Sequence, residues 1–116
     1  MIGTDLLQIS RVQVKESLIQ LTLRINEIEE FLQLETISQK QRYLASHIAA
    51  KEALFKATQN PHYLDYQILH RENGQPYVKD HPEIEISISH EKDYVLCFVL
   101  ILPSNVGSSS KEPTQS

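Results

Sequence analysis

The chain has 116 residues, 41% of them hydrophobic and 22% charged, which is typical of one globular domain and not of a disordered segment. Its formal net charge of −4 argues against a nucleic-acid-binding protein, because such proteins usually carry a basic face. The longest apolar run, residues 94–102, is shorter than the ~20 residues of a membrane helix, so no membrane span is expected. No basic segment precedes an apolar stretch at the start of the sequence, so no signal peptide is expected either. The single cysteine, Cys97, permits no intramolecular disulfide, which fits a cytoplasmic protein.

The N-terminal third of the sequence predicts a short strand followed by helix. Residues 1–2 are interpreted as a strand stub that runs into a tight turn at Gly3. From residue 5 to about residue 34, apolar residues recur at steps of three and four, which predicts helix with a break near residues 21–25.

A second helix is predicted in the middle of the chain. Ser38 and Gln41 have the spacing of a capping box, which is typical of a helix N-terminus. The helix is expected to end at Asn60-Pro61, because proline disfavours helix at the residue before it. Alanines at positions 45, 49 and 53 would form a stripe of small residues, which leaves room for another group to approach the helix closely.

The second half of the sequence predicts an antiparallel sheet. Asn73-Gly74 is a strong hairpin-turn signal between the segments 66–70 and 76–78. Isoleucines alternate with polar residues over 84–89, as in a half-buried strand. The segment 94–102 is apolar throughout, so it is predicted to be a strand that is buried on both faces.

These elements predict an α+β domain over residues 1–102, in which the N-terminal helices pack on the antiparallel sheet. Residues 103–116 are rich in serine and contain glycine and proline, so they are expected to form a polar, disordered C-terminal tail.

One acidic residue near the N-terminus and an acidic and a basic residue in the middle of the chain together suggest phosphate chemistry. Asp5 follows the predicted first strand, and Glu52 and Lys56 lie about one helical turn apart. Two converging carboxylates can bind Mg²⁺, whose other positions are filled by water and substrate phosphates. A lysine beside them can bind a phosphate as a point charge. A simpler interpretation of Glu52 and Lys56 alone is an exposed salt bridge within the helix, worth ~0.3–0.5 kcal/mol.

Several short segments agree in order and spacing with one protein family. They are Ile2-Gly3-Thr4-Asp5-Leu6, Ile9-Ser10-Arg11, Leu44-Ala45, Ala49-Ala50-Lys51-Glu52-Ala53, Lys56-Ala57, Glu72-Asn73-Gly74, Pro76-Tyr77, Ile88-Ser89-His90 and Tyr94. This pattern, which covers about residues 2–102, resembles the small bacterial holo-acyl-carrier-protein synthases, a class of 4′-phosphopantetheinyl transferases. The resemblance implies their fold and a role in fatty acid and lipid biosynthesis. The implied reaction moves the phosphopantetheine arm of coenzyme A to a serine of apo acyl carrier protein and releases 3′,5′-ADP. It also implies Mg²⁺ and a homotrimer that binds coenzyme A between neighbouring subunits.

The same resemblance implies roles for individual residues. Asp5 and Glu52 match the metal-binding acids, and Lys56 matches a lysine that contacts coenzyme A phosphates, so these three are the expected catalytic residues. The expected coenzyme A contacts are Lys56, His47, Gly74, Pro76, Ser89 and His90. The acidic carrier protein is expected to dock near Arg11, Lys15 and Arg24. No residue is evident as the general base.

The sequence departs from the family pattern at several places. His47 stands where the family usually has arginine, which would replace a permanent charge by a titratable one. Gln75 stands in place of a lysine, and residues 60–64 replace a glycine-rich loop, without which the backbone approaches a pyrophosphate less freely. An alternative is therefore a weakened or inactive paralogue that binds a nucleotide or a carrier protein. Asp5 and Glu52 favour the enzyme, because a binding module needs no convergent acids where phosphates lie.

Overall fold

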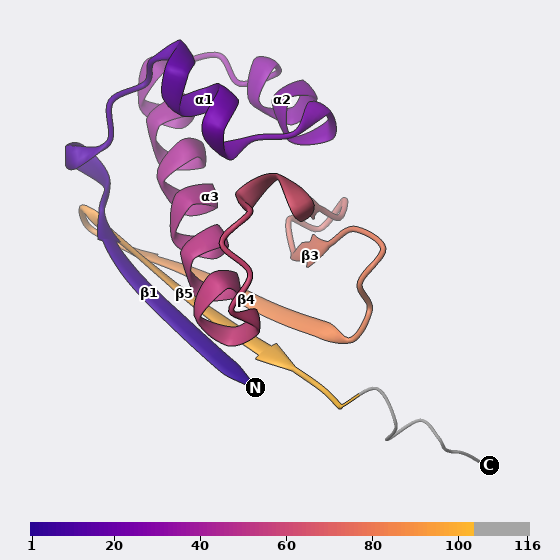
Figure 1. Cartoon of the computed structure of the whole chain (residues 1–116). Coiled ribbons are helices and arrows are strands. Elements are labelled where there is room, and N and C mark those ends of the chain that lie inside the picture. The colour runs from indigo at the N-terminus through magenta and orange to yellow at the C-terminus, as the bar shows by residue number, and fades with distance from the viewer. Residues whose placement is uncertain (104–116) are drawn as a thin grey trace.

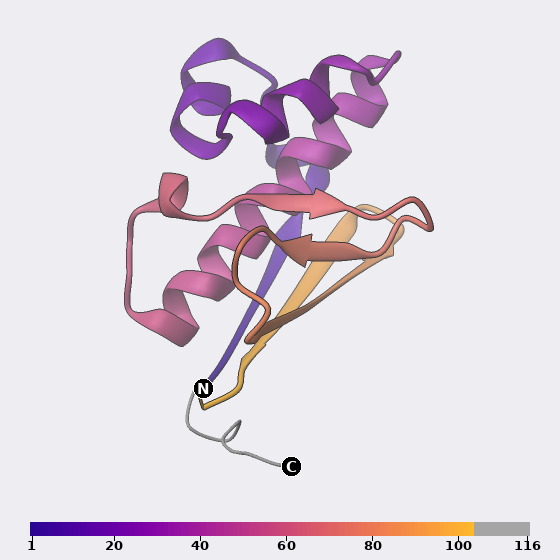
Figure 2. The ribbon, with the colours of Figure 1, turned by 90° about the vertical axis from the view of Figure 1, so that its right-hand side faces the viewer.

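The computed structural model describes residues 1–103 and places helices along one face of an antiparallel sheet (Figure 1). The elements in chain order are β1 (Ile2–Gln8), η1 (Ile9–Arg11), α1 (Glu16–Thr22), α2 (Ile25–Leu32), α3 (Ile37–Thr58), η2 (Tyr63–Asp65), β2 (Ile68–His70), β3 (Pro76–Val78), β4 (Ile84–Glu91) and β5 (Tyr94–Ile101). The main sheet has the strand order β1-β5-β4, and β2 pairs with β3 in a separate hairpin beside α3 (Figure 2). The predicted α+β class is confirmed.

β1 is a complete edge strand, so the predicted strand stub and the helix from residue 5 are wrong. Gly3 is not in a turn: it pairs with Val99 of β5 in the middle of the ladder. A Cβ at Gly3 would lie 1.9 Å from the carbonyl oxygen of Ala53, so β1 and α3 approach too closely for any side chain there. The alanine stripe of α3 therefore accommodates this strand. Pairing with residues that lie 86–98 positions away in the sequence overrides the local helical pattern.

The first α-helix begins at Glu16 and not at residue 5, whereas the later helix boundaries lie close to the predicted positions. The expected break near residues 21–25 is present, because α1 ends at Thr22 and α2 begins at Ile25. The capping box of α3 lies two residues earlier than predicted: the Thr36 side chain accepts from the Gln39 backbone N–H at 3.0 Å, and Gln39 accepts from the Thr36 backbone N–H at 3.1 Å. Among residues 1–103, no helix combines the length and apolarity that crossing a membrane requires.

The predicted hairpin is confirmed, and Gly74 in its turn has a φ of +89°, which favours glycine. The alternation predicted for β4 is also present, whereas the prediction that β5 is buried on both faces is wrong. Burial alternates along β5: Val95, Cys97 and Val99 are buried, and the residues between them are exposed. The reason is that α3 covers only one face of the sheet (Figure 1). The predicted tail lies, apart from Pro103, outside the described residues.

Candidate functional site

Two of the three predicted catalytic residues, Asp5 and Lys56, meet at the C-terminal end of α3. The Lys56 ammonium donates to Asp5 Oδ1 at 3.1 Å and to the Thr4 carbonyl at 2.9 Å, which joins the helix to β1. Glu52 lies one turn earlier on the same helix, on the same side as Lys56. Among the described residues, Lys56 pairs with Asp5 and not with Glu52, so the simple intrahelical salt bridge is not formed.

Glu52 is held by a residue that the sequence analysis missed. The Tyr63 hydroxyl in η2 donates a hydrogen bond to Glu52 Oε2. The two side chains face a cavity of about 530 Å³, the Glu52 pocket, whose described lining is Leu21, Glu52, Phe55, Pro61, His62, Tyr63, Leu64 and Asp65. Tyr63 belongs to no motif, and its distance from Glu52 in the sequence gives no helical signal, so only the folded chain reveals the contact.

The carboxylates of Asp5 and Glu52 suit Mg²⁺ only if water and substrate phosphates complete its coordination. Residues 1–103 contain no group of three or more acidic, histidine or cysteine side chains arranged around one metal position. Asp5 and Glu52 therefore form no complete protein cage. Mg²⁺ is usually held by one or two carboxylates together with water and substrate phosphates, so a pair of acids beside a lysine suits a metal that arrives with a phosphorylated substrate.

A second polar cluster lines a cavity of about 370 Å³ beside the N-terminal half of α3, here named the His90 pocket. The Ser46 hydroxyl donates to the Arg42 carbonyl at 2.7 Å, and His90 Nε2 lies 2.7 Å from Ser46 Oγ. A hydroxyl has one proton, so His90 Nε2 must be the donor to Ser46. His90 Nδ1 then has no bond to Ser46 and is the ring atom that can meet a ligand.

The charges around the His90 pocket favour an anion. Its described lining residues are Leu34, Gln39, Arg42, Tyr43, Ser46, His47, His70, Gly74, Pro76, Ile88 and His90. None of these is acidic, and Arg42 is the permanent cation among them. Burial and the positive charge of Arg42 both lower the pKa of His90. Arg42 and Ser46 are not predicted from the sequence, since their spacing of four residues on the helix is the one available signal and it is weak.

The remaining predicted coenzyme A residues lie in three different environments. Gly74 and Pro76, in the hairpin, line the His90 pocket as a group with His90. Ser89 is exposed and pairs with Leu96 on the face of the sheet that α3 does not cover, because consecutive strand residues point to opposite faces. Ser89 is therefore not brought together with the side chain of His90.

His47 borders the same pocket but is fully buried. Its Nδ1 lies 2.9 Å from the Tyr43 carbonyl and its Nε2 lies 2.9 Å from the Ile68 carbonyl, while the Tyr43 ring stacks on it at 4.0 Å. Burial lowers the pKa of His47. Both ring nitrogens thus face backbone carbonyl oxygens. This arrangement does not support the predicted contact between His47 and a phosphate of coenzyme A.

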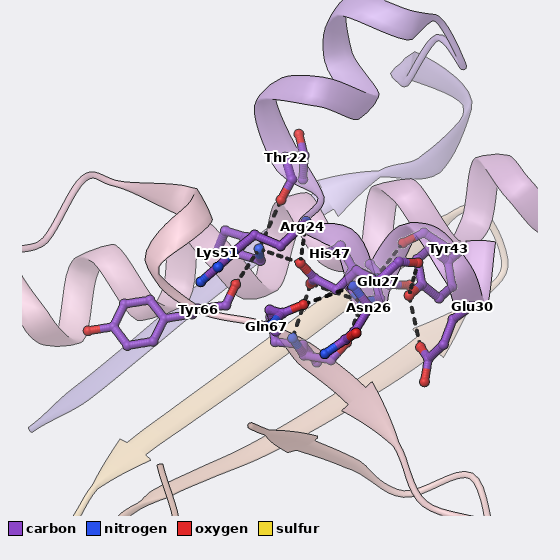
Figure 3. Close-up of polar contacts among 12 residues, drawn as sticks. Thr22, Arg24, Asn26, Glu27, Glu30, Tyr43, His47, Lys51, Tyr66 and Gln67 are labelled. Carbon is purple, nitrogen blue, oxygen red and sulfur yellow. Dashed lines mark hydrogen bonds and ion pairs between the residues drawn. The ribbon is translucent and has the colours of Figure 1, made fainter. Parts of the chain in front are cut away.

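A buried ionic network connects α3 to the rest of the helical layer (Figure 3). The Lys51 ammonium lies 3.0 Å from Glu27 Oε1 and 2.8–2.9 Å from the backbone carbonyl oxygens of Thr22, Tyr63 and Tyr66, so its three protons are shared among four acceptors. Glu27 and Lys51 are both buried, and a buried charge that loses its partner is strongly destabilising. The network therefore fixes α1, α2 and the segment around η2 on the helix that carries both polar clusters.

Comparison with known proteins decides the family. Residues 1–99 match the model of the 4′-phosphopantetheinyl transferase superfamily. The chain belongs to this superfamily. It is 36% identical over 109 residues to a holo-[acyl-carrier-protein] synthase of Ureaplasma parvum, with 90% of this chain and 95% of the relative covered.

Solved structures of the superfamily share the fold. A holo-ACP-synthase from Plasmodium yoelii superposes with a TM-score of 0.78 at 27% identity, covering 90% of this chain and 94% of that one. A holo-(acyl-carrier-protein) synthase from Bacillus anthracis, in complex with CoA (3′,5′-ADP), gives a TM-score of 0.76 at 26% identity, covering 86% and 93%. The family resemblance of the sequence is thereby confirmed.

The three basic residues expected to dock the carrier protein are all exposed, but they are not on one helical face. Arg11 ends η1, Lys15 is the N-cap of α1 and Arg24 is the N-cap of α2. α1 itself, Glu16–Thr22, contains no basic residue. In this member of the superfamily, the positive charge of the N-terminal segment thus lies at the ends of short helices.

Proposed function

We propose that this protein transfers the 4′-phosphopantetheine group of coenzyme A to a serine of apo acyl carrier protein and releases 3′,5′-ADP. The observation that carries the proposal is the contact between Asp5 of β1 and Lys56 of α3, with Glu52 one helical turn before Lys56. These residues belong to a chain whose superfamily relatives are named holo-[acyl-carrier-protein] synthase. Their carboxylates and ammonium group suit a pyrophosphate with its metal.

In the proposed reaction, the carrier serine oxygen forms a bond to the phosphorus that bears the pantetheine arm. The bond from that phosphorus to the bridging oxygen of the pyrophosphate breaks, and 3′,5′-ADP leaves. Asp5 and Glu52 would hold Mg²⁺, which when bound supplies positive charge to the pyrophosphate. Lys56 lies beside Asp5 and offsets negative charge on the leaving phosphate. The nucleophile belongs to the carrier protein, so this chain needs no nucleophilic side chain of its own.

The His90 pocket takes the other phosphate of coenzyme A in this proposal. Coenzyme A carries a pyrophosphate and a separate 3′-phosphate, and the second can be bound without a metal. Arg42 offers a permanent charge, and protonated His90 offers an Nδ1 donor, while Gly74 and Pro76 form part of the wall.

The active site is proposed to be shared between subunits of a homotrimer. Ser46 and Glu52 lie six residues apart on α3, which separates them by about 9 Å along the helix and by about 120° around it. The two clusters therefore open on different sides of one chain. A neighbouring subunit could bring its His90 pocket to the Asp5 cluster, so that coenzyme A lies between them.

An exposed apolar surface supports assembly. On the face of the sheet opposite α3, large apolar side chains of β1 and β5 are 41–63% exposed: Ile2, Leu6, Tyr94, Leu96, Phe98 and Leu100. A contiguous apolar patch of this kind is unusual on a monomer. Packing this face against its copies would also enlarge the core of a small domain.

The carrier protein is proposed to dock near Arg11, Lys15 and Arg24, because acyl carrier proteins are acidic and these side chains are exposed. The single cysteine, Cys97, is buried and permits no intramolecular disulfide, which suits a reducing compartment such as the cytoplasm.

One assay tests the proposed function directly. The protein is incubated with coenzyme A, Mg²⁺ and several apo carrier proteins, and each carrier is examined by mass spectrometry for the phosphopantetheine increment. The increment should appear, and it should disappear when Mg²⁺ is chelated. If no carrier is modified although 3′,5′-ADP binds, the chain is a nucleotide-binding paralogue and the transfer proposal is wrong.

A further inference from the structure

We propose that Tyr63 is a positioning residue that holds the Glu52 carboxylate in the orientation needed to bind the metal. The inference rests on the proposed function, since it assigns a role to the group that touches Glu52. The starting observation is that the Tyr63 hydroxyl donates to Glu52 Oε2 across the Glu52 pocket.

Tyr63 is itself fixed by the buried ionic network. Its backbone carbonyl accepts from the Lys51 ammonium at 2.9 Å, and Lys51 is 1% exposed and paired with Glu27. Lys51 immediately precedes Glu52 in α3. Two adjacent residues of α3 therefore act together. Glu52 supplies the carboxylate, and Lys51 holds the backbone of the loop that carries Tyr63.

The loop around Tyr63 is further ordered by its own polar contacts. The Asn60 side-chain amide donates to Asp65 Oδ2 at 2.8 Å, and the His62 backbone N–H donates to Asn60 Oδ1 at 3.0 Å. These contacts close the segment on both sides of Tyr63. The phenol thus reaches Glu52 from a backbone that is already positioned.

A bound phenol leaves Glu52 able to act as a ligand. A carboxylate has about four lone-pair sites over two oxygens, and one hydrogen bond to Oε2 occupies one of them. Groups that hydrogen-bond a metal ligand orient it, and their removal typically weakens metal binding or activity about 10–100-fold. The opposite possibility is competition, in which the phenol keeps Glu52 away from the metal, and the two predict opposite signs.

The test compares two matched variants, Tyr63→Phe and Tyr66→Phe. Both residues lie in the same segment, and both backbone carbonyls accept from Lys51. The Tyr66 ring points away from the network in Figure 3. Tyr66→Phe therefore removes a tyrosine hydroxyl from the same segment without removing a contact of the network, and it serves as the control. Mn²⁺ replaces Mg²⁺ as the probe, and free Mn²⁺ is measured by electron paramagnetic resonance in the presence of protein and coenzyme A, against coenzyme A alone.

Tyr63→Phe should weaken Mn²⁺ binding about tenfold and raise the Mg²⁺ concentration for half-maximal transfer by a similar factor. Tyr66→Phe should change neither quantity. The Tm and the metal-free affinity for 3′,5′-ADP should stay as in wild type, which separates positioning of Glu52 from general damage. Unchanged or tighter Mn²⁺ binding in Tyr63→Phe overturns the proposal.

Glu52→Gln supplies the reference for the proposed metal site. It should reduce Mn²⁺ binding at least as much as Tyr63→Phe. If Glu52→Gln leaves Mn²⁺ binding unchanged, Glu52 is not a metal ligand, and both the proposed metal site and the role of Tyr63 are wrong. If Glu52→Gln weakens binding and Tyr63→Phe does not, the metal site stands and only the positioning role is lost.

Discussion

The two ends of α3 carry polar groups with opposite requirements. At the C-terminal end, the Asp5 carboxylate pairs with the Lys56 ammonium and a second carboxylate, Glu52, lies one helical turn away, so the metal site proposed there needs a cation before a phosphate. At the N-terminal end, Arg42 makes no salt bridge with a described residue, and no described acid lines the His90 pocket. That pocket attracts an anion directly. Metal dependence should therefore belong to one end of the helix and not to the other.

Both ends depend on the same sheet register. Asp5 pairs with Cys97, and His90 pairs with Val95, so both face the side of the sheet that α3 covers. A slip of one residue in either ladder would turn the side chain to the opposite face. The comparison shows that one helix and one sheet place two chemically different sites, and that the central strand β5 aligns them.

The largest expected effect separates the two ends by removing the acids. Asp5→Asn and Glu52→Gln keep the shape of the side chain and remove its charge, so each should lower the transfer rate about a thousandfold. The Tm should remain near the wild-type value. Because the His90 pocket needs no metal, calorimetry without Mg²⁺ should still detect 3′,5′-ADP binding to both variants. Loss of this binding together with transfer would show that the two ends are not independent.

Subunit mixing asks whether the two ends work together across an interface. Asp5→Ala and His90→Ala proteins should each be nearly inactive alone. After unfolding and refolding as a mixture, about one interface in four should combine an intact acid cluster with an intact His90 pocket. Partial transfer activity should then return in the mixture. Trimers that re-form, detected by light scattering, but stay as inactive as the parents would place each site within one chain.

Arg42→Gln should show an intermediate effect that depends on one phosphate of the substrate. Loss of a charge-assisted hydrogen bond should raise the KM for coenzyme A about tenfold. The KM for 3′-dephospho-coenzyme A should change little, because that substrate lacks the group that Arg42 is proposed to bind. Arg71→Gln is the control, since Arg71 stacks on the Tyr77 ring at 4.4 Å and lies outside the His90 pocket. Equal changes for both substrates would contradict a phosphate contact.

The Asp5 end of the site could be expected from the sequence, and the His90 end only in part. Asp5, Glu52 and Lys56 are types of residue with a recognisable chemistry, and the i, i+4 spacing on a helix is local. Arg42 and Tyr63 are ordinary polar residues until the chain folds. Their roles depend on contacts with β4 and with the loop after α3, which no local spacing encodes.

The incorrect predictions for β1 and β5, and the unsupported one for His47, also arise from contacts between parts of the chain that are distant in the sequence. The apolar spacing of residues 5–34 predicts helix from residue 5, whereas residues 5–8 belong to β1, whose partner strand is at the other end of the chain. β5 was predicted to be buried on both faces because apolar composition does not tell whether a second layer is present. His47 was assigned by its alignment with a family position, whereas its two ring nitrogens face backbone carbonyls.

The smallest expected effect is a change in the pKa of His90, which tests the geometry of the His90 pocket without catalysis. Burial and the charge of Arg42 both lower this pKa, and Arg42→Gln removes only the second cause. A nearby cation disfavours the imidazolium, so its removal should raise the pKa of His90 part of the way toward the ordinary value. The Cε1–H resonance of His90, followed by NMR over a pH titration without ligand, measures the change. Arg71→Gln should leave this titration unchanged.

The same titration reports on the ligand. The titratable side chains that line the pocket with His90 are Arg42, Tyr43, His47 and His70, and among the described residues that line it none is a carboxylic acid whose charge would mask an added anion. A bound phosphate favours the imidazolium, so 3′,5′-ADP should raise the pKa of His90. By linkage, the complex binds more protons than the free protein, and the contribution of His90 to affinity should weaken as the pH rises through the pKa of His90 in the complex. If Arg42→Gln or 3′,5′-ADP left the pKa of His90 unchanged, Arg42 and the phosphate would not face His90, and the proposed contrast between the two ends of α3 would be wrong.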